Sequence, residues 1–232
     1  MTNGEGSDIV AHFRTGLDVI KRYPVMAVPP LVAQAVVFVL TLLFFGGAAT
    51  AVVIGGAAGL LGAAAGGLVL MLVGGLLSLI ASGVTVVMAR DALAAREPSM
   101  GDAFGAVMGR LGDVVIASIL VMVIVGVGMV LLVLPGVVAA FFLMFTLPAV
   151  LLDGSSALDG LKRSATLVKD NLGATVGLVI GIVLAAIVIM IVAKILGMVP
   201  FLGQLAAAVL TGAFVGYLTV VAVRVYQTLP RR

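Results

Sequence analysis

The chain has 232 residues, of which 63% are hydrophobic and only 10% are charged, and its mean hydropathy is +1.36. A soluble domain carries about 25% charged residues, so this composition excludes an ordinary soluble globular protein. Residues 24–89 and 114–152 carry no charge and far exceed the ~20 residues that a bilayer-spanning helix needs. Their side chains do not alternate between polar and apolar, which excludes a β-barrel. The composition therefore predicts an all-α integral membrane protein.

The scarcity of cysteine and histidine excludes several classes of site. The chain has no cysteine and one histidine, so disulfides, thiol catalysis and thiolate or histidine-rich metal sites are excluded. The net charge of +3 and the pI of about 9.6 indicate basic flanks that meet anionic lipid rather than nucleic acid. We therefore expect membrane lipids as partners, no nucleic acid and no cofactor.

The first two predicted spans enclose a segment of ambiguous structure. The first span, residues 25–45, begins among prolines, which a first helical turn tolerates. Residues 46–67 consist almost entirely of glycine, alanine and a few aliphatic residues. Their composition fits a hairpin loop, a re-entrant piece or helix extensions. The second span, residues 68–89, ends at Arg90 and Asp91.

A tight turn separates the next two predicted spans. Leu134-Pro135-Gly136 forms this turn, and Pro148 is expected to bend the end of the helix that follows, because proline disrupts helical hydrogen bonding. The last four spans are predicted at residues 114–134, 137–152, 172–196 and 204–225. The sequence thus predicts six transmembrane helices arranged as three hairpins.

The distribution of charge predicts how these spans are oriented. In the six-span arrangement, all ten acidic residues and every basic residue except Lys194 fall on one side of the membrane. Positive charge marks the cytoplasmic side of a membrane protein. Both termini and the two longer polar connections are therefore predicted to be cytoplasmic.

An amphipathic segment precedes the first, third and fifth spans, where apolar residues recur at intervals of three and four. The apolar faces comprise Ile9, Phe13, Leu17 and Ile20; Met100, Ala103, Phe104, Val107 and Leu111; and Leu158, Leu161, Ala165, Val168 and Leu172. Ser99 and Ser156 each precede an aspartate by three residues, which predicts helix N-caps. The pattern predicts one membrane domain, residues 1–232, with internal repeats at about 7–90, 99–153 and 155–226. The amphipathic pattern fits helices that lie in the headgroup layer, and it fits equally well helices that pack over the cytoplasmic ends of the spans.

Basic residues near the membrane surface are the candidate lipid or interface contacts. They are Lys21, Arg22, Arg110, Lys162, Arg163, Lys169 and Lys194. Lys194, near the end of the fifth span, fits either a lipid-phosphate contact or a lysine that snorkels to the interface. No catalytic or metal-binding residue is predicted, because the chain contains none of the usual catalytic motifs and His12 lies on a polar helix face.

Glycines at intervals of four residues predict close helix packing. They are Gly173, Gly177 and Gly181 in the fifth span and Gly212 and Gly216 in the sixth. Stacked glycines let two helices approach backbone to backbone, so these spans are predicted to form a close pair, within one chain or between two. Gln34 and Gln204 fit either hydrogen bonds between helices or the lining of a path.

One stretch carries a family resemblance. Leu134-Pro135-Gly136 is followed by Pro148 within the next helix and then by Asp153-Gly154, and the amphipathic segment reads Ala157-Leu158, Leu161-Lys162-Arg163-Ser164 and Leu167-Val168. This order of an LPG turn, a proline-containing helix and an ALxxLKRS helix resembles the membrane-domain superfamily of glycerophosphodiester phosphodiesterases and related six-span prokaryotic proteins. The resemblance implies a compact six-span bundle with interfacial helices, located in a prokaryotic plasma membrane. It implies no activity, since catalysis in those enzymes belongs to a separate soluble domain.

The sequence favours a non-enzymatic multi-pass membrane protein that interacts with lipids or partner proteins through its cytoplasmic interfacial helices. Such a protein organises the membrane or serves as an accessory subunit, and either a homo-oligomer or another membrane protein is a compatible partner. One alternative is a small permease or channel for a neutral or amphiphilic solute. A lipid-headgroup enzyme is a disfavoured alternative, because the cytoplasmic carboxylates show no spacing that specifies an acid–base pair.

Overall fold

The computed structural model describes residues 3–199 and 202–230, with the backbone alone described at 3–9, 45–53, 202 and 204–205. Ile9 and Gln204 from the sequence analysis therefore lie outside the described side chains. The described residues form helices and no strand. The elements are α1 (Asn3–Arg22), η1 (Pro24–Ala27), α2 (Val28–Leu93), α3 (Met100–Met108), α4 (Leu111–Leu131), α5 (Val133–Leu143), α6 (Thr146–Leu152), α7 (Ala157–Asp170), α8 (Leu172–Gly197) and α9 (Leu202–Thr228).

Six helical segments of the described chain are long and apolar enough to cross a membrane, which confirms the predicted all-α class and the predicted number of such helices. They are Pro24–Phe44, Ile54–Leu93, Leu111–Leu131, Val133–Leu152, Leu172–Gly197 and Ala206–Thr228. Five of them agree with the predicted spans to within a few residues. The second is much longer than predicted, because it includes part of the glycine- and alanine-rich segment.

The glycine- and alanine-rich segment continues the helix on both sides of a single reversal at Gly56. Gly56 has φ 52° and ψ −128° and is the only non-helical residue inside α2. Glycine adopts a positive φ without the steric cost that other residues meet, so the chain turns back there. Of the three structures compatible with residues 46–67, the helix extensions are therefore the one adopted.

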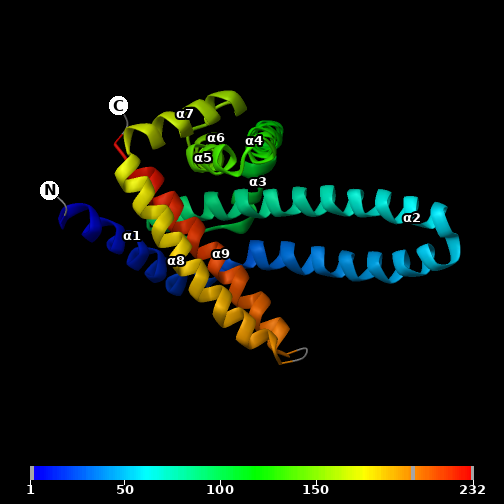
Figure 1. Cartoon of the computed structure of the whole chain (residues 1–232). Coiled ribbons are helices and arrows are strands. Elements are labelled where there is room, and N and C mark those ends of the chain that lie inside the picture. Colours follow the sequence, from blue (N-terminus) through cyan, green and yellow to red (C-terminus); the bar gives the residue numbers. More distant parts are fainter. Residues whose placement is uncertain (1–2, 200–201, 231–232) are drawn as a thin grey trace.

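Two long helix pairs, the two arms of α2 and α8 with α9, diverge from a common junction (Figure 1). A third pair, α4 with α5, is in contact along the chain beside this junction. The buried apolar residues gather at the junction, around Val84–Ala92 of α2, Val107 of α3, Val150 of α6 and Val220–Tyr226 of α9. The far ends are exposed, as at Met71 and Val130. The structure is therefore not the compact bundle that the family resemblance implies.

A break between α5 and α6 occurs where Pro148 was predicted to bend the helix. Proline has no N–H, so the carbonyl of Met144 loses its usual helical partner. Ser164 of α7 stabilises the break: the N–H of Phe145 donates to its Oγ at 3.1 Å, and that hydroxyl donates to the carbonyl of Phe142 at 2.8 Å. A polar residue of the amphipathic segment thereby attaches α7 to the bent helix.

The turn between α4 and α5 lies at Leu132 and not at the predicted Leu134-Pro135-Gly136, which forms part of the first turn of α5, where the missing N–H of a proline is tolerated. Leu132 is extended, with φ −161° and ψ 138°, and separates the two helices. A Cβ atom placed on Gly128 would lie 2.8 Å from the Cα of Gly136, closer than non-bonded carbons approach. Glycine at position 128 is therefore required for this pair to close.

The predicted N-caps of the second and third amphipathic segments are present. The Oγ of Ser99 accepts from the N–H of Asp102, and the Oγ of Ser156 accepts from the N–H of Asp159, both at 3.3 Å. Each bond satisfies one of the N–H groups left unpaired at a helix start. These caps set where α3 and α7 begin.

Candidate functional site

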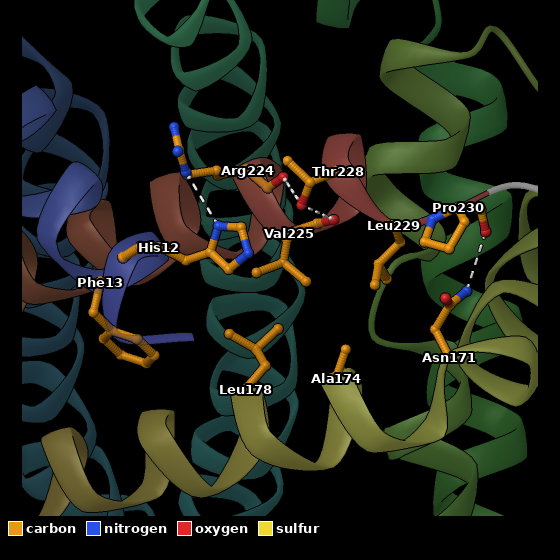
Figure 2. A pocket seen from close by; sticks show the side chains of 11 residues that line it. His12, Phe13, Asn171, Ala174, Leu178, Arg224, Val225, Thr228, Leu229 and Pro230 are labelled. Carbon is orange, nitrogen blue, oxygen red and sulfur yellow. Dashed lines mark hydrogen bonds between the residues drawn. The ribbon is translucent and has the colours of Figure 1, made fainter. Parts of the chain in front are cut away.

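Both ends of the chain meet α8 around a pocket of about 380 Å³ at the junction (Figure 2). His12 and Phe13 of α1 form one side, and the last turn of α9 with Pro230 forms another. Ala174 and Leu178 of α8 point into the pocket and form an apolar floor. The polar groups of the pocket therefore lie at its rim, above an apolar base.

The polar groups of this rim bind one another and connect the chain ends. The Nε of Arg224 donates to Nδ1 of His12 at 3.1 Å, which joins α9 to α1. The Nδ2 of Asn171 donates to the carbonyls of Leu167 and Pro230 at 2.9 and 3.2 Å, which joins the start of α8 to the end of α9. The rim therefore holds three elements together.

The chemistry available in this pocket is that of packing and binding. The hydroxyl of Thr228 lies 3.1 Å from the carbonyl oxygens of both Arg224 and Val225 and donates to its own helix, so it is not paired with a base. The described residues contain no cluster of three or more histidine, aspartate or glutamate residues suited to a metal ion. The hydroxyl of Thr228, which lines the pocket, is therefore used within α9.

One face of α1 is packed against α8 and α9. The ring of Phe13 lies against Gly181 of α8, where an added Cβ would meet it at 2.6 Å. Gly16 faces Val221 and Tyr217 of α9, and the hydroxyl of Tyr217 donates to the carbonyl of Phe13 at 3.2 Å. Because each contact involves a glycine or a backbone group, α1 lies close to α8 and α9 and its rotation is fixed.

The fixed rotation of α1 exposes a stripe of alternating apolar and basic side chains, which we call the α1 stripe: Val10, Arg14, Leu17 and Lys21. Residues at this spacing fall on one side of a helix. Val10 and Leu17 are 56% and 46% exposed, and Arg14 and Lys21 are exposed as well. The predicted apolar face of α1 is therefore divided, since Phe13 packs inward while Leu17 points outward.

The inner face of α7 packs against the protein. Leu161, Ser164 and Val168 are buried, while Lys162, Arg163 and Lys169 are exposed. Within α3, Ala103 and Val107 are buried and Met100 and Phe104 are exposed. The inner apolar residues of α7 and α3 thus contribute to the junction. The outer face of α7 carries basic side chains, whereas the outer face of α3 carries the exposed apolar pair Met100 and Phe104.

Asp153, at the end of α6, connects three elements that the sequence analysis did not bring together. Its carboxylate pairs with the Nε of Arg163 at 2.7 Å and accepts a hydrogen bond from the hydroxyl of Tyr226. Tyr226 is fully buried, and the centre of its ring lies 5.7 Å from the centre of the Phe145 ring. An isolated aspartate and an isolated tyrosine form no sequence motif, so only the fold brings them together.

The remaining basic candidates do not form one site. The guanidinium of Arg22 lies 5.5 Å from the ring centre of Tyr23. Arg110 is half-buried, and its guanidinium lies against the backbone of Gly154, which has φ 70°. Lys194 is exposed and lines a groove between α8 and α9. The structure places these residues at separate positions along the junction and, for Lys194, near the far end of α8.

Three of the five glycines predicted to pack α8 against α9 contact other elements. Gly212 faces Leu31 of α2, and Gly216 faces the backbone of η1, while Gly181 holds Phe13. Gly173 is exposed and Gly177 is half-buried. The helices α8 and α9 do lie side by side (Figure 1). However, Gly181 allows the close approach of α1, Gly212 that of α2 and Gly216 that of η1.

Most hydroxyl groups within the long apolar helices donate to their own helix. Such bonds satisfy the hydroxyl without a partner from another helix. They run from Thr41, Ser82, Thr85, Thr175, Thr211 and Thr219 to the carbonyl four residues earlier. The donor hydrogen of each of these groups is therefore used within its own helix.

Comparison with known proteins identifies a family but no activity. The family model described as "Domain of unknown function (DUF7847)" matches residues 8–229, so the chain belongs to this family. A comparison with curated proteins found no match. A comparison with solved structures found none either.

Proposed function

We propose that the chain is a non-enzymatic multi-pass protein of a prokaryotic plasma membrane that binds anionic lipid headgroups at its cytoplasmic face through the α1 stripe. In this proposal the six long apolar helices cross the membrane as three hairpins, and α1, α3 and α7 lie at the cytoplasmic surface. The protein requires no cofactor and organises the membrane or serves as an accessory subunit. The relation to the membrane domain of glycerophosphodiester phosphodiesterases is part of the proposal and carries no catalytic role.

The single observation that supports lipid binding is the exposure of the α1 stripe. A helix that lies in the headgroup layer inserts apolar side chains into the boundary with the acyl chains and directs lysine and arginine to the phosphates. Val10 and Leu17 supply the apolar part, and Arg14 and Lys21 supply the charge. Since the opposite face of α1 is packed on α8 and α9, the stripe is held outward, as this role requires.

The expected contribution of charge is moderate and measurable. A lysine or arginine near an anionic surface contributes about 1 kcal/mol, so Arg14 and Lys21 together contribute about 2 kcal/mol, or roughly 30-fold in affinity. The basic face of α7 offers a second charged surface, but most of its apolar residues, including Leu161 and Val168, are packed inward and only Leu158 among the larger ones is exposed. We therefore expect α1 to contribute more to the lipid preference than α7.

Charge removal on α1 tests this proposal. The double variant Arg14→Gln/Lys21→Gln is expected to lose most of the preference for phosphatidylglycerol over phosphatidylcholine, as measured by native mass spectrometry of lipids retained by the purified protein. The matched control is Lys162→Gln/Lys169→Gln on the outer face of α7, which should retain most of the preference. An unchanged preference in the α1 variant, or its loss in the α7 variant alone, would contradict the proposal.

A further inference from the structure

An apolar groove of about 600 Å³ opens between α4 on one side and α5 with the start of α6 on the other. It extends from Ser118 to Gly126 along α4 and from Ala140 to Leu147 on the opposite wall. Its far end lies next to the close contact of Gly128 with Gly136, and its other wall contains the break after Leu143. The two helices therefore touch beside the turn and separate where α5 is interrupted.

The lining of this groove is suited to a hydrocarbon chain. Ser118 and Thr146 are its only side chains with a hydroxyl, and the hydroxyl of Thr146 donates to the carbonyl of Leu143 at 2.8 Å. Met122 and Met144 add flexible side chains, which adapt to an irregular apolar surface. A polar solute would find few partners here, whereas an acyl chain would gain contacts along both walls.

A basic residue lies where both walls of the groove reach the junction. Arg110 immediately precedes α4, and its guanidinium lies against Gly154, which follows α6. No ion pair joins Arg110 to an acidic residue in the described part of the chain. The residue is half-buried, so part of its surface is open to contact with an anionic group.

The length from this charge to the end of the groove matches one lipid. At 1.5 Å per helical residue, Arg110 and Gly126 are separated by about 24 Å along α4. Half of a bilayer, with its headgroup layer, measures about 20–22 Å. An anionic phospholipid of the cytoplasmic leaflet with its phosphate at Arg110 would therefore extend its acyl chain over most of the distance to Gly126.

From the apolar groove, the position of Arg110 at its junction end and the length between them, we infer that the chain binds one anionic phospholipid between α4 and α5. Its acyl chain fills the groove and its phosphate contacts Arg110. This site is separate from the α1 stripe, although it rests on the same proposed placement in the membrane. A smaller apolar cavity of about 270 Å³ adjoins the groove at Met144 and Leu147.

Photo-crosslinking tests this inference on the full chain in nanodiscs. The probe is phosphatidylglycerol with a diazirine in the middle of one acyl chain, and the modified peptides are mapped by mass spectrometry. Crosslinks should concentrate on the groove walls around Met122 and Met144. The variant Gly126→Phe should reduce them at least fivefold, because a Cβ at Gly126 has no protein atom within 4 Å and the ring can occupy the groove.

A matched variant and a second blocking variant complete the test. Gly75→Phe in α2 also adds a ring where no atom lies within 4 Å, but outside the groove, and should leave the crosslinks unchanged. Ala140→Phe blocks from the opposite wall. Even labelling of all exposed helices, with no loss in either blocking variant, would overturn the site, since the groove would then be ordinary lipid-facing surface.

The headgroup and the membrane placement are tested separately. Arg110→Gln should reduce crosslinking by the phosphatidylglycerol probe about fivefold while leaving a phosphatidylcholine probe unaffected; equal yields from wild type and variant would overturn the assigned headgroup. Arg14→Gln/Lys21→Gln should leave the groove crosslinks unchanged. If the chain fails to float with vesicles, the proposed membrane placement is wrong, whereas flotation without groove crosslinks contradicts this inference alone.

Discussion

Replacement of Gly128 by valine is expected to separate α4 from α5. The added Cβ would lie 2.8 Å from both the N and the Cα of Gly136 and 3.1 Å from the carbonyl carbon of Pro135. These neighbours are backbone atoms, so they cannot move away as the end of a flexible side chain would. Overpacking typically costs about 1–3 kcal/mol, and we expect at least the upper part of that range here.

The effect of Gly128→Val can be measured as a lower midpoint of thermal unfolding in detergent. Because the chain has no tryptophan, loss of helical circular dichroism or of the size-exclusion peak is the suitable signal. Gly126→Val is a close control, since it lies two residues away on the same helix and its Cβ would meet no atom within 4 Å. Equal midpoints for the two variants would contradict the close contact of α4 with α5.

The second large effect is expected at Tyr226. Tyr226→Ala removes a fully buried ring that contacts Phe145, together with the hydroxyl that donates to Asp153. Loss of a buried aromatic side chain costs about 3–5 kcal/mol. Tyr226→Phe keeps the ring, and loss of its hydrogen bond to a charged group costs about 1.5–3 kcal/mol.

The same unfolding measurement separates these two contributions. We expect the midpoint to fall in the order wild type, Tyr226→Phe, Tyr226→Ala. The exposed neighbour Gln227 provides a control, and Gln227→Ala should unfold like the wild type. If Tyr226→Phe matched the wild type, the hydroxyl of Tyr226 would not stabilise the junction between α6, α7 and α9.

Features that depend on one helix at a time could be predicted from the sequence. A long uncharged stretch in lipid has to satisfy its own backbone hydrogen bonds and therefore forms a helix. The serines at the starts of α3 and α7 cap their helices through neighbouring atoms. The bend associated with Pro148 likewise follows from the missing N–H of that residue. These predictions needed no knowledge of the rest of the fold.

Features that depend on contacts between distant elements could not be predicted in this way. Glycine spacing indicates that some element approaches closely, but the element that approaches Gly212 is α2 rather than α8. In the same way, an amphipathic pattern does not separate the side chains that pack on neighbouring helices from those that face lipid. Phe13 and Leu17 belong to one apolar pattern in the sequence, yet Phe13 packs inward and Leu17 is exposed.

The membrane depth of Leu17 tests the central claim most directly. Because the chain has no cysteine, Leu17→Cys can carry a single nitroxide label in liposomes that contain phosphatidylglycerol. Electron paramagnetic resonance then compares its accessibility to oxygen, which enters lipid, with that to a nickel chelate, which stays in water. Met71→Cys and Glu97→Cys, at two exposed positions, provide the lipid and water references. If the α1 stripe lies in the membrane surface, the label at position 17 should be more accessible to oxygen than to the chelate, with a ratio close to that at position 71. An accessibility to the chelate equal to that at position 97 would contradict the account.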